Sequence, residues 1–168
     1  LEKYSDTKDL VSAVADVDAM IVRSDKVTPE VLNAAGRLKI VVRAGAGYDN
    51  IDLAASKACG IVVENTPGQN ANAVAELAVA MMIYMSRNQF TPVSGIEISG
   101  KKLGIQAFGN VGRLVGKKAA ALGMTVLATD PFIPAEKIAE AGAQPIATVK
   151  ELYSQCDFVS VHIPATPE

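Results

Sequence analysis

The residues whose types and spacing are best suited to chemistry lie between positions 104 and 130. Gly109 and Gly112 follow an apolar run and open a stretch with helical spacing, and Asp130 ends the next apolar run. This layout is typical of a dinucleotide-binding βαβ unit, where a glycine-rich turn meets a pyrophosphate at a helix N-terminus. Gly109 would allow that approach, and Gly112 would allow close packing of the helix on the sheet. The Asp130 carboxylate would accept hydrogen bonds from ribose hydroxyl groups.

The fingerprint departs from GxGxxG at its first position, where this chain has Ala107. A Cβ is tolerated there only if the turn keeps φ negative, so Ala107 weakens the fingerprint. A glycine-rich turn with a purely structural role is the alternative interpretation. We favour dinucleotide binding because the strand, the helix and the acidic residue all occur at the expected places.

A second glycine-rich segment, residues 43–47, follows another apolar run and begins with Arg43. No acidic residue ends the following strand at the distance that a second nucleotide site requires. Exposed backbone N–H groups beside Arg43 are instead suited to hold a substrate carboxylate. On the residues alone, this interpretation and a plain tight turn both stay open.

Short β-branched runs alternate with stretches of helical spacing along the chain. This rhythm predicts an α/β architecture, with parallel sheets that carry helices on their faces. Thr28 before Pro29, and Thr148 three residues before Glu151, have the spacing of helix starts. Strands are expected at residues 19–22, 40–42, 61–63, 103–108, 125–128 and 158–161, and further helices at residues 6–15, 53–58, 71–86, 113–121 and 134–141.

The longest helical stretch, residues 71–86, carries apolar side chains almost all round. Such a helix is buried on every face, so we expect it between two layers or two subunits; a central core helix of one domain is the alternative. Residues 87–100 contain Pro, Gly, Ser and Thr without a long periodic element, and we interpret them as a crossover between domains. The predicted domains are residues 1–92 and 93–168, and a homodimer is expected.

Composition excludes several other classes of protein. The 168 residues carry 16 Lys and Arg against 18 Asp and Glu, without a dense cationic cluster, so nucleic acid is not an expected partner. The longest apolar run, residues 77–85, is too short to span a bilayer, and no signal peptide is visible. Cys59 and Cys156 form no CxxC pair, and there is a single histidine. We therefore expect no disulfide and no metal site, inert buried thiols and a cytoplasmic protein.

Six segments of the chain occur in a familiar order: IVRSDKVTPEVL, IVVRAGAGYDNIDL, GIVVENTPGQNANAVAELAVAMM, GKKLGIQAFGNVGR, GMTVLATDPF and CDFVSVHIPATPE. In order and spacing they resemble the D-isomer-specific 2-hydroxyacid dehydrogenase family, over nearly the whole chain. The resemblance implies a flavodoxin-like partial substrate domain followed by the first part of a Rossmann dinucleotide-binding domain, with NAD as the cofactor. It also implies a fragment that is truncated at both ends, without the family's first strand.

The resemblance assigns roles residue by residue. Positions that match the family's substrate-side loops are Arg23, Ser24, Arg43, Ala44, Gly45 and Gly47. Positions that match the cofactor site are Ala46 at the nicotinamide end, Ala107, Gly109, Asn110, Val111 and Gly112 in the pyrophosphate loop, Asp130 at the adenosine ribose, and the backbone of Ile163 and Pro164.

The family's catalytic arginine, glutamate and acid/base histidine lie beyond Glu168, so we expect no catalytic residue in this chain. His162 matches a strand end of the family, and we interpret it as a structural histidine. The activity implied is NAD-dependent oxidation of a small anionic D-2-hydroxy acid, or reduction of its 2-oxo acid. 3-Phosphoglycerate, and with it serine biosynthesis, is favoured. Alternatives are a glyoxylate, hydroxypyruvate or D-lactate reductase, an NAD-binding corepressor-like scaffold, and an inactive fragment.

Overall fold

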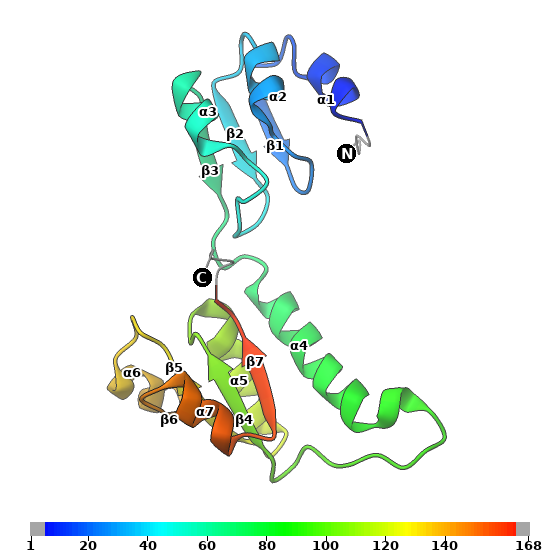
Figure 1. The fold of residues 1–168 in the computed structure, drawn as a ribbon, viewed down its shortest axis with the longest axis vertical. Coiled ribbons are helices and arrows are strands. Elements are labelled where there is room, and N and C mark those ends of the chain that lie inside the picture. Colours follow the sequence, from blue (N-terminus) through cyan, green and yellow to red (C-terminus); the bar gives the residue numbers. More distant parts are fainter. Residues whose placement is uncertain (1–5, 164–168) are drawn as a thin grey trace. The chain divides into compact units, whose positions relative to one another are not determined.

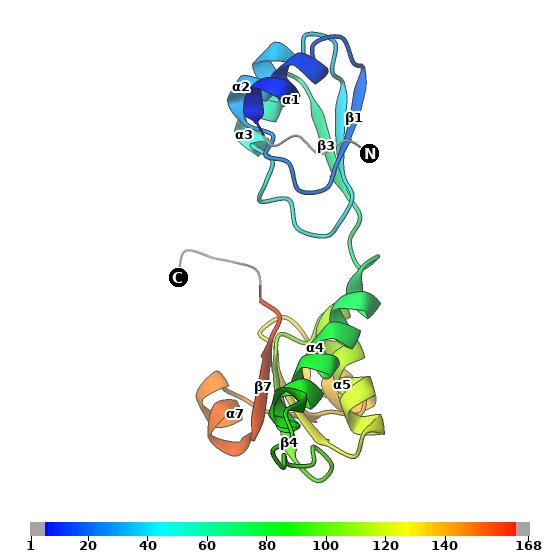
Figure 2. The same cartoon turned by 90° about the vertical axis from the view of Figure 1, so that its right-hand side faces the viewer.

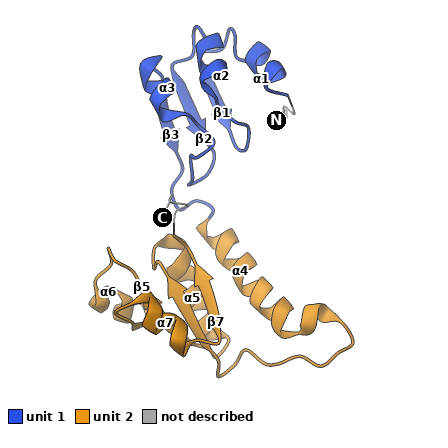
Figure 3. Ribbon diagram, viewed as in Figure 1, with its two compact units in different colours: residues 1–70 blue, residues 71–168 orange. Residues whose placement is uncertain are grey.

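A computed structural model of the chain describes residues 6–163 (Figure 1). It divides into two compact units, Leu1–Asn70 and Ala71–Glu168, which we call unit 1 and unit 2 (Figure 3). Each unit contains a sheet in which all strand pairs are parallel, and each has helices between its strands. The α/β class predicted from the alternating pattern is confirmed.

Unit 1 is built on a three-stranded sheet with the order β1-β2-β3. At the carboxyl ends of the strands, Val22 is level with Arg43, and Arg43 with Asn65. Its three helices lie on one face of this sheet (Figure 2). The elements are α1 (Thr7–Ala13), β1 (Ala19–Val22), α2 (Pro29–Ala34), β2 (Ile40–Arg43), α3 (Leu53–Ala58) and β3 (Val62–Asn65).

The core of unit 1 lies between the helices and that face of the sheet. Val31 and Leu32 of α2 are fully buried together with Val41 of β2. Side chains alternate between the two faces along a strand, and the other face is open: Ile21 is 71% exposed and Val62 is 53% exposed. The helices therefore bury only one side of this sheet.

Both predicted helix starts are confirmed. The Thr28 hydroxyl accepts a hydrogen bond from the Val31 N–H at 3.5 Å, and Pro29 is the first residue of α2. The Thr148 hydroxyl accepts from the Glu151 N–H at 3.1 Å and caps α7 (Val149–Gln155). Each hydroxyl satisfies a donor that the first turn of its helix leaves free.

Unit 2 is built on a four-stranded sheet with the order β6-β5-β4-β7. The chain runs outward from β4 to β5 and β6, and then returns to the other side of β4 as β7 (Figure 1). The direction of strand addition thus reverses between β4 and β7. The elements are α4 (Ala71–Ser86), the 3-10 turn η1 (Asn88–Phe90), β4 (Lys102–Gln106), α5 (Asn110–Ala121), β5 (Thr125–Thr129), α6 (Ala135–Glu140), β6 (Gln144–Pro145), α7 and β7 (Phe158–Val161).

Helix α4 belongs to unit 2, where it packs on α5. The compact units therefore divide after Asn70, whereas the predicted domains divide after residue 92. The physical reason is that Ala75 of α4 is fully buried in the core that also contains Leu103 and Val115. Burial on every face, as expected from the apolar pattern, is not observed: Leu77 is 61% exposed and Met81 is 58% exposed.

The two cysteines differ from the expectation of buried thiols. Cys59 is exposed, because it caps the C-terminal end of α3 at the surface. Cys156 is half-buried against Gly104, and burial raises the pKa of its thiol. Within residues 6–163 there is no cluster of three His, Cys, Asp or Glu side chains that suits a metal ion. None of the described helices has the length and hydropathy to cross a membrane.

Candidate cofactor and substrate site

The reversal of strand order in unit 2 marks the place where open α/β sheets bind ligands. In such sheets the ligand lies outside the carboxyl ends of the two strands that flank the reversal. Here those strands are β4 and β7, and they lead into residues 107–112 and into His162 and Ile163. Pro164, predicted to line the cofactor site, lies outside the described residues.

Phe108 of the glycine-rich loop is held at its backbone and at its side chain. Its N–H donates to Oδ2 of Asp130 at 2.7 Å, and its carbonyl oxygen accepts from Nε of Arg113 at 3.0 Å. Its side chain is only 1% exposed and belongs to the core of unit 2. Both backbone polar groups and the side chain of this residue are therefore held.

The condition under which a Cβ is tolerated at position 107, a negative φ, is not met. The φ of Ala107 is +72°, in the left-handed region that favours glycine. The Ala107 N–H continues the ladder of β4 by donating to the Thr129 carbonyl at 2.9 Å, and its own carbonyl oxygen lies where a Cβ on Gly112 would collide with it. The Ala107 N–H is therefore fixed to β5, and its carbonyl oxygen lies against the first turn of α5. The chain turns sharply between these two contacts, in a conformation that strains an alanine.

The two glycines of the loop have different reasons to be glycine. Gly112 is buried at the first turn of α5, and the collision with the Ala107 carbonyl excludes a side chain there. Gly109 has an ordinary φ of −74°, and a Cβ built on it has no atom within 4 Å. The fold itself does not require glycine at position 109. The space that its missing side chain leaves open is suited to a ligand that approaches the backbone closely.

The N-terminus of α5 has no side-chain cap, because Gly109 occupies the capping position. The N–H groups of Asn110, Val111 and Gly112 belong to the first turn and have no intrahelical acceptor. This 12-residue helix adds the partial positive charge of its dipole at the same point. An anion, and a pyrophosphate in particular, fits these donors.

Asp130 is already engaged with the backbone. Besides the bond from Phe108, its Oδ1 accepts from the N–H groups of Phe132 at 2.8 Å and Ile133 at 3.2 Å. A carboxylate offers about four lone-pair directions, so roughly one remains, on Oδ2, for a ribose hydroxyl. The predicted ribose ligand therefore also shapes the loop. Sequence reasoning missed that role, as it missed the bonds of Phe108 and Arg113.

In unit 1 the loops that follow β1 and β2 are tied together. The Val27 N–H donates to the Asn50 carbonyl at 2.8 Å, and the Asp52 N–H donates to the Val27 carbonyl at 3.0 Å. The Asn50 side-chain amide donates to the Asp25 carbonyl at 2.8 Å. The structure thus places the loop that carries Arg23 and Ser24 beside the loop that begins at Arg43.

The second half of this loop offers backbone donors, because the N–H groups of Ala44 and Gly45 are already bonded to the carbonyls of Val22 and Arg43. The carbonyl oxygens of Gly45 and Ala46 are taken by the Thr66 N–H at 3.0 Å and the Asn65 amide at 2.7 Å. The N–H groups of Ala46 and Gly47 find no acceptor in the described part of the chain. The Arg43 guanidinium fills the space that a Cβ on Gly45 would need, and its buried Nε lacks a partner among the described residues. This combination suits a carboxylate.

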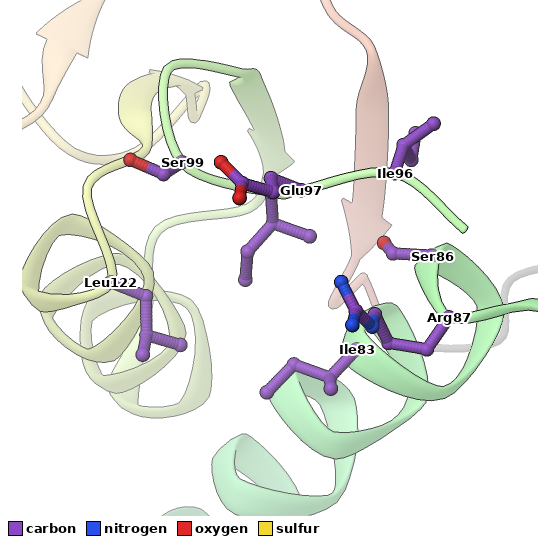
Figure 4. Close-up of a pocket in the computed structure, with 8 residues that line it drawn as sticks. Ile83, Ser86, Arg87, Ile96, Glu97, Ser99 and Leu122 are labelled. Carbon is purple, nitrogen blue, oxygen red and sulfur yellow. The ribbon is translucent and has the colours of Figure 1, made fainter. Parts of the chain in front are cut away.

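The hollows of the two units coincide only in part with these groups. In unit 1, a hollow of about 480 Å³ includes Ser24 and Lys26, but none of residues 43–47. In unit 2, the pocket in Figure 4 has a volume of about 260 Å³ and is lined by Ile83, Arg87 and Leu122 among others. It also includes Ser99, which precedes β4, so it lies near the amino end of that strand and apart from the glycine-rich loop.

His162 has contacts that suit a structural residue. Its ring Nε2 lies 2.9 Å from the Ser160 hydroxyl, and its backbone N–H donates to the Gln106 carbonyl at 2.9 Å. Partial burial lowers the pKa of the imidazole below its usual value, so the ring is neutral at pH 7. Ile163, which follows it two residues beyond the end of β7, is half exposed.

The strand order and the glycine-rich turn at its reversal place unit 2 in the class of Rossmann-type nucleotide-binding folds. The chain belongs to the D-isomer-specific 2-hydroxyacid dehydrogenase family, since residues 1–161 match the family profile described as "D-isomer specific 2-hydroxyacid dehydrogenase, catalytic domain". The expected fold is confirmed: the chain matches the substrate domain of this family and the start of its NAD-binding domain.

Two relatives and one solved structure illustrate the similarity. D-3-phosphoglycerate dehydrogenase of Mycobacterium tuberculosis is 39% identical over 97% of this chain and 33% of its own length. Hydroxypyruvate reductase of Thermotoga maritima is 37% identical over 98% of this chain and 57% of its own length. The NAD+-bound 3-phosphoglycerate dehydrogenase of Entamoeba histolytica has a TM-score of 0.89 and 43% identity, over 99% of this chain and 53% of that one. The chain thus spans between a third and three fifths of the length of these proteins.

The strain at Ala107 gives a first testable prediction. Ala107→Gly relieves the left-handed conformation and should raise the free energy of unfolding by about 0.5–1 kcal/mol, after the entropic cost of glycine is subtracted. Urea denaturation followed by circular dichroism measures this change. The matched control is Ala80→Gly at an exposed position within α4, which should lower stability by about 1 kcal/mol. Equal losses in both variants would show that Ala107 is not strained.

Proposed function

We propose that this chain supplies the cofactor-binding and part of the substrate-binding surface of an NAD-dependent oxidoreductase of D-2-hydroxy acids. The observation that carries the proposal is the uncapped N-terminus of α5 at the strand-order reversal, next to the Asp130 carboxylate. The NAD+ in the related Entamoeba structure supports the same cofactor for this chain.

The residues present fit NAD by their donor and acceptor types. The N–H groups of Asn110, Val111 and Gly112 would hold the pyrophosphate, and Oδ2 of Asp130 would accept a ribose hydroxyl. When bound, the nicotinamide exchanges a hydride with the carbon that carries the substrate's hydroxyl or oxo group. The chain's own contribution is to bind and orient the cofactor and the substrate anion.

The substrate side of the proposal rests on unit 1. Arg43 and the N–H groups of Ala46 and Gly47, which have no acceptor among residues 6–163, would bind the carboxylate, with Arg23 and Ser24 on the neighbouring loop. We favour 3-phosphoglycerate as the substrate, because relatives such as the mycobacterial one are named for it. Hydroxypyruvate is the second candidate, because the Thermotoga relative is named for its reduction.

Loss of the Arg43 guanidinium should weaken substrate binding. A charge-assisted hydrogen bond removed from such a site costs about 1.5–3 kcal/mol, so Arg43→Ala in the full-length enzyme should raise KM for 3-phosphoglycerate at least about tenfold. Steady-state kinetics with 3-phosphoglycerate, and in the reverse direction with hydroxypyruvate, glyoxylate and pyruvate, measures both this effect and the substrate preference. Arg37→Ala is the control, since Arg37 forms an exposed ion pair with Asp18. An unchanged kcat/KM in Arg43→Ala would refute this assignment, and no turnover with any acid would favour a non-catalytic NAD-binding scaffold.

Asp130 should select NAD over NADP. Its carboxylate would face a 2′-phosphate with like charge at the position where it accepts a ribose hydroxyl. Asp130→Asn removes the charge and keeps one acceptor oxygen, which can serve Phe108 or the pair Phe132 and Ile133 but not all three. Alanine would leave all three N–H groups without an acceptor, so asparagine disturbs the loop less. We expect the wild type to prefer NAD strongly and Asp130→Asn to lose about tenfold of that preference. The comparison is kcat/KM for both cofactors, and equal use of NADP by the wild type would contradict the ribose assignment.

We also propose a homodimer in which α4 meets its copy. Leu77, Met81 and Met85 are each more than half exposed along this helix, and Tyr84 and Phe90 continue the apolar surface as an edge-to-face pair. Monomeric proteins rarely expose contiguous apolar surface of this kind. We call Leu77, Met81 and Met85 the stripe. A two-fold axis would place the stripe of one copy against the stripe of the other, so that apolar surface is covered on both copies.

The dimer proposal predicts a change in sedimentation. Met81→Lys places a charge in the stripe and should convert dimers to monomers at the same protein concentration, because a buried unpaired charge is costly. Analytical ultracentrifugation measures the change, and Ala139→Lys on the exposed side of α6 is the control. A wild-type protein that sediments as a monomer at high micromolar concentration would rule out the dimer.

A further inference from the structure

We propose that Arg113 and Asp130 clamp the backbone of Phe108 and thereby hold the glycine-rich loop in the shape that receives the pyrophosphate. This makes Arg113 a positioning residue for cofactor binding, in addition to the contacts assigned above. The inference rests on the proposed function, because the loop is shaped for a cofactor only if a cofactor binds there.

The clamp consists of two hydrogen bonds on the two sides of one residue. Asp130 follows β5 and accepts from the Phe108 N–H at 2.7 Å, and Arg113 in the first turn of α5 donates to the Phe108 carbonyl at 3.0 Å. Both bonds involve a charged side chain, and such bonds are stronger than neutral ones. The loop is therefore tied to the strand on one side and to the helix on the other.

The strained neighbour explains why the loop needs such a clamp. Ala107 has a φ of +72°, and an alanine in that region relaxes toward negative φ unless its surroundings prevent it. Relaxation at Ala107 would rotate the following peptide group, which carries the Phe108 N–H. The bond from that N–H to Asp130, together with the bond from Arg113, opposes the rotation.

A direct contact of Arg113 with a cofactor phosphate is the competing explanation. The two roles are separable because the clamp uses the Nε donor, whereas a phosphate contact uses the positive charge. Arg113→Lys keeps the charge and lacks a donor at the Nε position. Arg113→Ala lacks both. Lys117→Ala removes a charge one turn further along α5, at an exposed position outside the site, and serves as the control.

The first measurement is the Kd for NAD in the full-length protein by isothermal titration calorimetry. The clamp predicts that Arg113→Ala and Arg113→Lys both raise Kd about tenfold, the loss expected for one charge-assisted hydrogen bond, while Lys117→Ala changes it less than about twofold. Affinity near the wild-type value in Arg113→Lys would overturn the clamp in favour of a phosphate contact. Unchanged affinity in Arg113→Ala would overturn both the clamp and a phosphate contact by Arg113.

The second measurement is a double-mutant cycle with Ala107→Gly. Glycine adopts the left-handed turn without external restraint, so Ala107→Gly in the Arg113→Ala background should recover most of the lost NAD affinity. Ala107→Gly alone should change Kd little. If the effects of the two substitutions on the free energy of NAD binding are additive, so that the double variant binds NAD as weakly as Arg113→Ala, Arg113 does not act through the loop and the proposal fails.

The third measurement needs no cofactor. Hydrogen exchange of the Phe108 amide, followed by NMR without ligand, should be slow in the wild type and about tenfold faster in Arg113→Ala. Equal exchange in both proteins would overturn the clamp even if NAD binds. If the wild type does not bind NAD but its Phe108 amide shows this difference, the clamp stands as a structural device and the proposed function fails.

Discussion

The parallel pairing of β4 with both of its neighbours is the constraint on which the candidate site depends. Because Gln106 is level with Thr129 of β5 and with Val161 of β7, three chain segments leave the sheet at the same edge. Asp130 can reach the Phe108 N–H only for this reason, although 22 positions separate the two residues. A one-residue slip of β5 would turn its side chains to the opposite faces and remove the carboxylate from the loop.

The two units share a combination of groups that suits an anion, namely backbone N–H groups and an arginine. In each, a loop at the carboxyl end of a strand offers backbone N–H groups, and an arginine from the same or the following element lies against that loop. Arg43 covers Gly45 in unit 1, and Arg113 binds the Phe108 carbonyl in unit 2. The two arginines differ in the hydrogen bonding of Nε. The buried Nε of Arg43 has no partner among the described residues, whereas Nε of Arg113 donates to the Phe108 carbonyl.

Much of this architecture could be predicted from the sequence, because hydrophobic period and helix caps are local signals. The bounds of β1, α3, α4 and β7 agree with those expected from the pattern. The two-residue β6 was missed because so short a strand carries no period. The left-handed φ of Ala107 and the three backbone hydrogen bonds that Asp130 accepts were also missed. Both depend on contacts that form only when the fold brings the loop after β4 beside the end of β5. The exposure of α4 depends on which face α5 covers, and an apolar pattern does not specify this.

The first and last positions of the glycine-rich fingerprint, Ala107 and Gly112, also differ in which substitutions they can accept. At Gly112 every substitution adds a Cβ where the Ala107 carbonyl already lies, so no other residue type fits without a shift of the backbone. At Ala107 every alanine codon becomes a glycine codon by a single base change, and the left-handed turn then loses its steric penalty. Within one short loop, one position is fixed by geometry, while the other stands one point mutation from a more relaxed backbone.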